Sequence, residues 1–302
     1  MYTIFLYNKG RSLSKRSDFL KRIELDAYAK INLSLDVLRK RDDGYHELEM
    51  IMQQIELKDK IILKEKNTGI ELTCTNKKVP TDSTNLVYKA HKLLKEKFNI
   101  NKGIKIHIEK NIPIAAGLAG GSSDAAQTLI GLNEIWSLGL TNKELMEIGV
   151  EIGADIPYCI MGGTALACGI GEKLTELTNF KDKIILLAKP DIDVSTGYVY
   201  GNLDIKSIKN HPKTKELIHA IIIDDVKFVA QNMKNVLENV TIKKHPIIND
   251  IKKQMIDCGA LGSLMSGSGP TVFAIFDDSK KAAKCKKLLG QNIDEVYLTK
   301  TI

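Results

Sequence analysis

The sequence predicts an α+β protein, and three observations support this prediction. Segments with the two-residue period of strands and segments with the spacing of amphipathic helices follow one another along the whole chain. Of the 302 residues, 43% are hydrophobic and 27% are charged, which is typical of a soluble globular protein with ample apolar content for a core. No apolar run approaches the roughly 18 residues of a membrane span, and the length allows one large domain or two ordinary ones.

In the first half of the chain, alternating apolar residues predict strands at residues 25–37, 49–54, 60–64, 70–74 and 104–108. The Arg-Asp-Asp-Gly sequence at residues 41–44 is favourable for a hairpin turn between the first two strands. A helix is expected from about Asn85, another from the end of the glycine-rich stretch through Trp136, and a third that ends at Gly153. Thr141 and Glu144 have the spacing of a capping box and mark the start of that third helix.

In the second half, strands are expected at residues 165–168 and 184–188, followed by a long helix at 216–239 and another at 247–258. A strand, a glycine loop, a strand at 271–276, a helix at 279–289 and a strand at 295–300 complete the order. No internal repeat or low-complexity linker interrupts it, so the sequence marks no flexible boundary between domains.

The most informative segment is the glycine-rich stretch at residues 113–126, which joins a predicted strand to a predicted helix. Backbone N–H groups at the start of a helix have no partner inside the helix, and glycines let a phosphate approach them closely. Ser122, Ser123 and Asp124 are suitable residues to cap such a helix. The segment therefore predicts a phosphate-binding loop, with a glycine-rich turn that holds no ligand as the alternative.

This segment differs from the two common phosphate-binding motifs. A P-loop has Lys and then Ser or Thr after its last glycine, whereas Ser-Ser-Asp follows Gly121. The dinucleotide fingerprint G-x-G-x-x-G does not match the spacing of Gly117, Gly120 and Gly121 either. A third kind of phosphate loop is therefore indicated.

Charge and cysteine usage narrow the class of protein further. The net charge of +7 arises from 44 basic and 37 acidic residues spread along the chain, which suits an anionic small substrate and gives no basic cluster for nucleic acid. The cysteines are odd in number and form no C-x-x-C pair, so free thiols in a reducing cytoplasm are expected: Cys74, Cys159, Cys168, Cys258 and Cys285. Residues 1–22 have a short apolar start before their basic residues, the reverse of a signal peptide, and we expect an N-terminal extension or a mobile tail there.

Three motifs resemble those of the GHMP kinases, the superfamily of galactokinase, homoserine kinase and mevalonate kinase. Residues 113–126 resemble its ATP-binding loop, residues 29–33 (Ala-Lys-Ile-Asn-Leu) its N-terminal motif, and residues 262–271 its C-terminal glycine motif. Within this superfamily the chain resembles the 4-diphosphocytidyl-2-C-methyl-D-erythritol kinases, through Asp-Gly-Tyr-His at 43–46 and Gly-Ala-Asp-Ile-Pro at 153–157. Ala119 stands where many relatives have a glycine, and we expect little consequence, because alanine tolerates most backbone conformations other than positive φ.

The resemblance implies a two-domain fold with the active site in the cleft between the domains. A ribosomal-protein-S5-like ATP-binding domain would cover residues 23–170 and a ferredoxin-like α/β sandwich, the substrate domain, residues 171–302, with the boundary between 163 and 182. The resemblance also implies ATP as co-substrate with Mg²⁺, no tightly bound cofactor and no protein metal site. The ATP-binding residues would be Pro113, Ile114, Ala115, Ala116, Gly117, Leu118, Ala119, Gly120, Gly121, Ser122 and Ser123.

The resemblance assigns catalysis to Lys30 and Asp155. Asp155 would accept or orient the proton of the substrate hydroxyl, although its sequence alone favours an ordinary turn aspartate. Lys30 would lie beside Asp155 and keep that carboxylate ionised, and its alternative is a charged residue that protects an edge strand.

Substrate recognition is expected at Tyr45 and His46, which would stack on a cytosine and hydrogen-bond its edge. Tyr200 is the preferred candidate for the opposite face of the base, with Tyr198 second, and half-buried structural aromatics are the alternative for all of them. Asn32 and Thr196 are the remaining substrate-binding candidates. Residues 266–269 would form a second glycine turn that either closes over a ligand or braces the cleft.

The expected activity is transfer of the γ-phosphoryl group of ATP to the 2-hydroxyl of 4-diphosphocytidyl-2-C-methyl-D-erythritol, in the non-mevalonate isoprenoid pathway. The expected partner is this small molecule, without nucleic acid or membrane, on a monomer or weak homodimer. A homoserine- or mevalonate-type kinase is disfavoured by the Gly-Tyr-His sequence at residues 44–46. A catalytically silent nucleotide sensor would need neither Lys30 nor Asp155, and a nucleic-acid-binding protein would have clustered arginines.

Overall fold

A computed structural model describes residues 21–302, and these residues form two compact units. Unit 1 comprises residues 21–27, 58–111 and 120–161, and unit 2 comprises residues 28–57, 112–119 and 162–302. Each unit is assembled from alternating segments because two long strands, β1 (Arg22–Lys40) and β2 (His46–Lys66), contribute to both. Both units are thus discontinuous in sequence, and the division into residues 23–170 and 171–302 stays a prediction. Most of the expected N-terminal extension, residues 1–20, lies outside the described residues.

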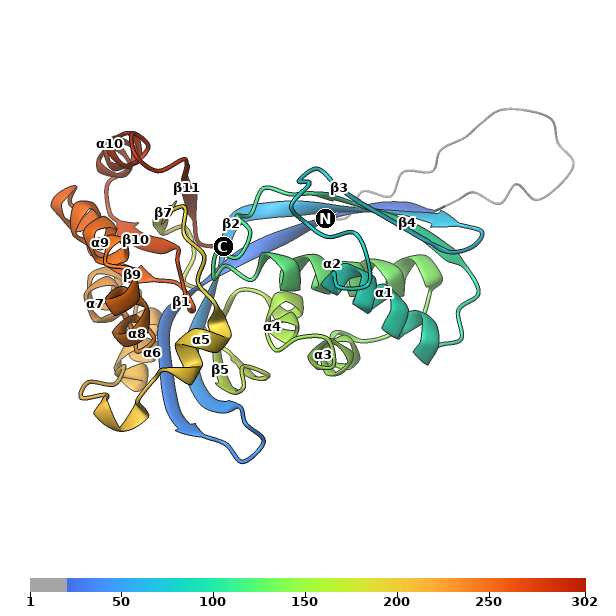
Figure 1. The fold of residues 1–302 in the computed structure, drawn as a ribbon, viewed down its shortest axis with the longest axis horizontal. Helices are drawn as coiled ribbons and strands as arrows, with labels where there is room; N and C mark the ends of the chain where they lie inside the picture. Colours follow the sequence, from blue (N-terminus) through green and yellow to red (C-terminus); the bar gives the residue numbers. More distant parts are fainter. Residues whose placement is uncertain (1–20) are drawn as a thin grey trace, which may run out of the picture. The chain divides into compact units, whose positions relative to one another are not determined.

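Unit 1 is a sheet with one face covered by helices (Figure 1). The second half of β2 pairs antiparallel with β4 (Gly103–Glu109), which pairs parallel with β3 (Ile70–Cys74). Four helices complete the unit: α1 (Leu86–Lys97), α2 (Gly120–Trp136), α3 (Asn142–Val150) and α4 (Ile156–Met161). A methyl group at Gly131 of α2 would lie 2.8 Å from the side chain of Leu63 on β2, so α2 packs directly on the sheet.

Two local signals for the starts of unit 1 helices, near Asn85 and at Thr141, are confirmed. Asn85 caps α1 by accepting a hydrogen bond from the backbone N–H of Val87 at 2.8 Å. Thr141 and Glu144 form both hydrogen bonds of the capping box at the start of α3. The prediction for the end of α3 is wrong, because the helix ends at Val150 and a turn leads to α4.

Unit 2 contains two sheets. In the first, β1 lies beside β2 and pairs parallel with β8 (Lys234–Asn235), and β2 pairs antiparallel with β5 (Thr164–Gly169), which pairs with β6 (Lys173–Glu176). The second is antiparallel, in the order β11 (Glu295–Lys300), β7 (Ile184–Lys189), β10 (Val272–Phe276) and β9 (Gly262–Met265). The helices of this unit are α5 (Thr196–Gly201), α6 (Thr214–Ile222), α7 (Val226–Asn232), α8 (Glu238–Lys244), α9 (Ile247–Asp257) and α10 (Ser279–Leu289), with a 3₁₀ turn at Ile205–Ser207.

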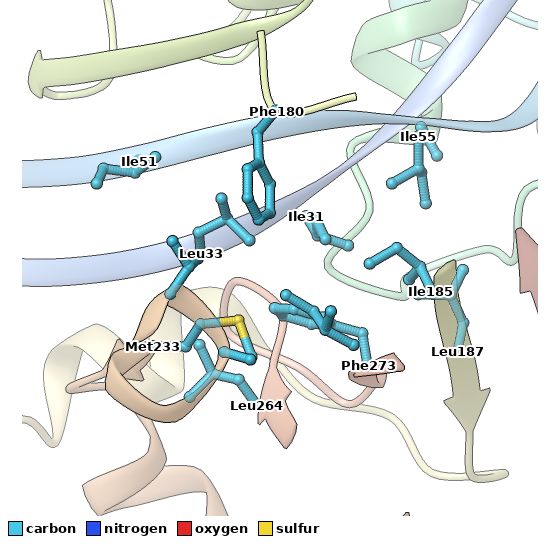
Figure 2. Close-up of a cluster of buried hydrophobic side chains, with 14 of the residues drawn as sticks. Ile31, Leu33, Ile51, Ile55, Phe180, Ile185, Leu187, Met233, Leu264 and Phe273 are labelled. Atoms are coloured by element: carbon cyan, nitrogen blue, oxygen red, sulfur yellow. The ribbon is translucent and has the colours of Figure 1, made fainter. Parts of the chain in front are cut away.

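The core of unit 2 lies between its two sheets and α6 and α7. Figure 2 shows Ile31 and Leu33 of β1 and Ile51 of β2 facing Phe273 of β10 and Met233, which follows α7. All of these side chains are buried. Burial of apolar area at about 25 cal/mol per Å² is the main term that stabilises such a cluster. Ala29, Ile31 and Leu33, at every second position of β1, therefore face this core.

Two element predictions are wrong. The helix expected at residues 216–239 is divided into α6, α7, β8 and the start of α8, because Asp224 adopts a φ of 57° and Asp225 caps a new helix. The strands expected at 49–54 and 60–64 are one continuous strand, β2. Over residues 21–302, no helix is long and apolar enough to cross a membrane.

Candidate active site

A buried polar row runs along β1, on the face opposite to the core residues Ile31 and Leu33. It consists of every second residue of the strand: Lys30, Asn32, Ser34 and Asp36, all buried. Burying polar side chains is costly unless each finds a partner. Ser34 and Asp36 were missed from the sequence, although the alternation that places Asn32 beside Lys30 extends to both.

Lys30 is only 5% exposed, and the neighbouring backbone and side chains hold its ammonium group in place. Its Nζ donates hydrogen bonds to Asn32 Oδ1 at 2.7 Å and to the carbonyl oxygen of Gly117 at 3.2 Å. Its backbone N–H donates to the carbonyl of Leu118 at 3.1 Å. The alternative of an exposed, edge-protecting lysine is therefore wrong. The structure brings Lys30 to the glycine-rich loop, and Asn32 contacts the Lys30 ammonium beside it.

The glycine-rich loop alternates between anchored residues and residues with left-handed backbone conformation. Ala116 and Leu118 are buried in the core of unit 2, whereas Ala115, Gly117 and Ala119 have φ angles of 51°, 72° and 55°. Alternation of this kind turns successive N–H groups toward one side and forms an anion-binding concavity. The expectation for Ala119 is wrong: its positive φ is the one conformation that alanine adopts only with strain.

The second glycine turn, at residues 266–269, packs against this loop within unit 2. Ser266 Oγ donates to the carbonyl of Gly117 at 3.0 Å, so that this oxygen accepts from both Ser266 and Lys30. A Cβ at Gly117 would overlap the carbonyl oxygen of Ser266. A Cβ at Gly267 would lie 3.2 Å from the carbonyl oxygen of Gly117 and 3.6 Å from Lys30 Nζ. Of the two roles expected for the second turn, these contacts support bracing.

Asn235 of β8 holds the second glycine turn in position. Its Nδ2 donates to the carbonyls of Met265 and Gly267 at 2.8 and 2.7 Å, and its Oδ1 accepts from the N–H of Leu237. Nothing in the sequence signalled this residue, because β8 has two residues and lay inside the predicted long helix. Thr241 adds a further hydrogen bond, from its hydroxyl to the carbonyl of Ser268 at 3.2 Å.

His46 and Tyr200 form an aromatic pair, with ring centroids 5.2 Å apart and a tilt of 33°. Burial, with a contribution from Lys40, lowers the pKa of His46, so its imidazole is neutral at pH 7 and has one donor and one acceptor nitrogen. Tyr45 is 60% exposed on the neighbouring hairpin turn. Tyr198 points elsewhere, with Lys244 Nζ 3.7 Å from its ring centre, so the preference for Tyr200 has structural support.

Thr196 connects this aromatic pair to the glycine turns. Its hydroxyl lies 2.9 Å from the hydroxyl of Ser268, at the first residue of α5, which also carries Tyr200. Ser195, the residue before it, caps α5 by accepting from the N–H of Tyr198. Unit 2 thus holds one chain of contacts that runs from Lys30 through Gly117 and residues 266–268 to Tyr200.

The remaining predicted site residues belong to unit 1. Gly120 to Ser123 form the first turn of α2, and because the helix begins at Gly120, Ser122 and Ser123 lie inside it and do not cap it. Asp155 is half-buried and directly precedes α4, where its carbonyl accepts from the N–H of Cys159 at 3.0 Å. The expected contact between Asp155 and Lys30 stays a prediction, as do the substrate roles of all these residues. Among residues 21–302, no group of three or more His, Cys, Asp or Glu side chains could hold a metal ion.

Comparison with known proteins shows the family to which the chain belongs. Family models described as the GHMP kinases N-terminal domain and GHMP kinases C terminal match residues 85–163 and 217–292. A 4-diphosphocytidyl-2-C-methyl-D-erythritol kinase from Clostridium novyi (strain NT) is 54% identical over 276 residues, which is 91% of this chain and 99% of the relative. The chain belongs to the 4-diphosphocytidyl-2-C-methyl-D-erythritol kinase family.

Other members and solved structures support the same family and fold. The 4-diphosphocytidyl-2-C-methyl-D-erythritol kinase of Clostridium tetani (strain Massachusetts / E88) is 51% identical over 93% of this chain and 100% of its own length. A crystal structure of a 4-(cytidine 5'-diphospho)-2C-methyl-D-erythritol kinase matches with a TM-score of 0.79 and 28% identity, over 92% of this chain and 98% of the other. Homoserine kinase from Cytophaga hutchinsonii, at 20% identity and a TM-score of 0.73, shares the fold. The predicted GHMP kinase fold is confirmed, and the chain is a small-molecule kinase of this family.

Proposed function

We propose that this kinase transfers the γ-phosphoryl group of ATP to the 2-hydroxyl of 4-diphosphocytidyl-2-C-methyl-D-erythritol, giving the 2-phosphate and ADP. The observation that carries the proposal is the position of the Lys30 ammonium, which is buried and bound to the carbonyl of Gly117 where the two glycine turns meet. A cation fixed at this point would stabilise the charge that develops on the transferred phosphoryl group, and it would not need to reorganise during the reaction.

Each further part of the reaction has a candidate residue. The left-handed residues of the glycine-rich loop and the first turn of α2 would bind the ATP phosphates through backbone N–H groups. Mg²⁺ would enter with these phosphates, because Mg²⁺ is commonly bound in part by substrate phosphate oxygens. Asp155, on the corner before α4, would accept or orient the proton of the attacking hydroxyl.

The cytosine would be recognised by the aromatic residues of unit 2. A base that enters between Tyr45 and Tyr200 would displace the present contact between His46 and Tyr200, and the neutral imidazole would then hydrogen-bond the edge of the base. Asn32 and the hydroxyl of Thr196 would contact the remainder of the substrate. A reducing compartment such as the cytoplasm suits the five free cysteines.

The test is an assay of ADP release from purified protein with ATP and a panel of alcohols. We expect turnover with the cytidylyl substrate and none with homoserine, mevalonate or galactose. Turnover of one of these competitors without activity on the cytidylyl substrate would overturn the proposal.

A further inference from the structure

The two ends of the glycine-rich loop meet at a buried charged cluster in unit 1. Lys110 follows β4 and precedes the loop, whereas Asp124 follows the loop as the fifth residue of α2. Lys110 Nζ lies 2.8 Å from Asp124 Oδ2 and 2.5 Å from Oδ2 of Asp59 on β2. The side chains are 5%, 3% and 0% exposed in the order Lys110, Asp124, Asp59. The N–H of Asn111 also donates to Asp59. The start of the loop is therefore bound directly to β2 through Asp59, and its end is bound through Asp124 and Lys110.

This cluster does not have the composition of a simple stabilising ion pair. Two carboxylates face one ammonium, and within residues 21–302 Asp124 Oδ1 has no hydrogen-bond partner. A buried ion pair is often no more stabilising than a well-packed apolar replacement, whereas it does fix the geometry of the groups that it joins. We therefore attribute these charges to the positioning of the loop ends and not to a gain in stability.

Resting on the assignment of the glycine-rich loop to ATP, we propose that Lys110, Asp59 and Asp124 form a clamp that closes the loop at its base and positions it for ATP. Lys110 is a positioning residue in this proposal, acting through Asp124 on the helix turn directly before it. That turn carries the N–H groups of Gly120 to Ser123, and the carbonyl of Asp124 also accepts from the hydroxyl of Thr128 at 2.8 Å. Movement of Asp124 would therefore move the N–H groups that face the phosphates.

The protonation state of Asp124 sets the net charge of the clamp. Burial, with a contribution from Asp59, raises the pKa of Asp124 to about 8, although Lys110 opposes the shift. The two aspartates raise the pKa of Lys110 above its usual value, although its burial acts in the opposite direction. The other titratable group whose pKa responds to these charges is the thiol of Cys74 at the end of β3. Near pH 7 one proton on Asp124 balances the cluster, and its loss at higher pH adds a second negative charge that loosens the clamp.

The first test removes the ammonium. In Lys110→Met, we expect the Kd of a non-hydrolysable ATP analogue to rise about ten- to hundredfold, which corresponds to about 1.4–2.8 kcal/mol of lost binding free energy. The KM for the cytidylyl substrate should change less than twofold. The control is Lys105→Met on β4, which removes an exposed ion pair with Glu71 in the same unit. Equal ATP-analogue affinity in both variants would overturn the clamp.

The second test keeps the shape of the cluster and serves also if Lys110→Met fails to fold. In the wild type, the Kd of the ATP analogue should rise between pH 7 and 9.5 as Asp124 loses its proton. In Asp124→Asn this rise should be absent, because the amide cannot ionise, and the exposed control Glu71→Gln should behave as the wild type. An unchanged pH profile in Asp124→Asn would overturn the clamp. A wild type that binds no ATP analogue at any pH would instead overturn the proposed function.

Discussion

Replacing Gly117 with alanine tests how closely the two glycine turns approach each other. Gly117 has a φ of 72°, and a left-handed conformation costs alanine about 1–2 kcal/mol. A smaller unfolded-state entropy returns about 0.4–1 kcal/mol of this. The added methyl group would also overlap the carbonyl of Ser266, and relieving such overpacking costs about 1–3 kcal/mol. Gly117→Ala should therefore lower the free energy of unfolding by about 2–4 kcal/mol.

Gly44→Ala is the matched control in the same unit. Gly44 has a φ of 86° with no heavy atom within 4 Å of the added methyl group, so only the backbone cost applies, about 0.5–1.5 kcal/mol. Urea unfolding followed by circular dichroism measures both variants against the wild type. Equal losses in the two variants would refute the close approach of Gly117 and Ser266. The kinase activity of Gly117→Ala can also be compared with that of the wild type, because the carbonyl of Gly117 accepts a hydrogen bond from Lys30.

Four further predictions concern other parts of the chain. Asp155→Asn should lower kcat by about 10²–10⁴ with little change in substrate KM, and steady-state kinetics with near-normal kcat would return Asp155 to a turn residue. Tyr45→Ala should weaken cytidylyl substrate binding by about ten- to hundredfold in calorimetry, the scale of a lost base stack, whereas Tyr198→Ala should not. Equal effects of the two substitutions would contradict stacking of Tyr45 on the cytosine. Ala119→Gly should stabilise the protein by about 0.5–1 kcal/mol in urea, because glycine relieves a φ of 55°, and any loss of stability would argue against strain there. Burial lowers the pKa of His91 from 6.5 to about 4, so the free energy of unfolding should fall as the pH falls from 6.5 toward 4. Thermal melting should show a smaller loss of stability over that range in His91→Leu than in the wild type.

The sequence alone predicted the starts of α1 and α3. Asn85 and the Thr141–Glu144 capping box act within a few residues, so local sequence is sufficient to predict them. The division of residues 216–239 was not predictable in the same way. A φ of 57° at Asp224 interrupts an apolar pattern that continues with helical spacing, and tertiary packing selects that conformation.

The motifs also identified the family and the residues around Lys30, because each motif lies within a short segment. What they could not provide were the partners from distant segments. Asn235 holds the second glycine turn through hydrogen bonds to carbonyls 30 and 32 residues away. Asp36 contacts His211, which is 175 residues away in the sequence, with a distance of 2.9 Å between Oδ1 and Nδ1. No local periodicity predicts such pairs, since each is formed by chain folding.

The sequence by itself therefore indicated where many of the helices and strands form and which segment resembles the ATP-binding loop of the GHMP kinases, because spacing and caps act locally. Only the tertiary structure decided that Ala119 is strained, that Lys30 is buried against Gly117, and that Lys110 lies between two aspartates. The physical reason is that backbone strain, burial and charge pairing depend on groups that meet only when distant segments pack together, and the free energy of each depends on that environment.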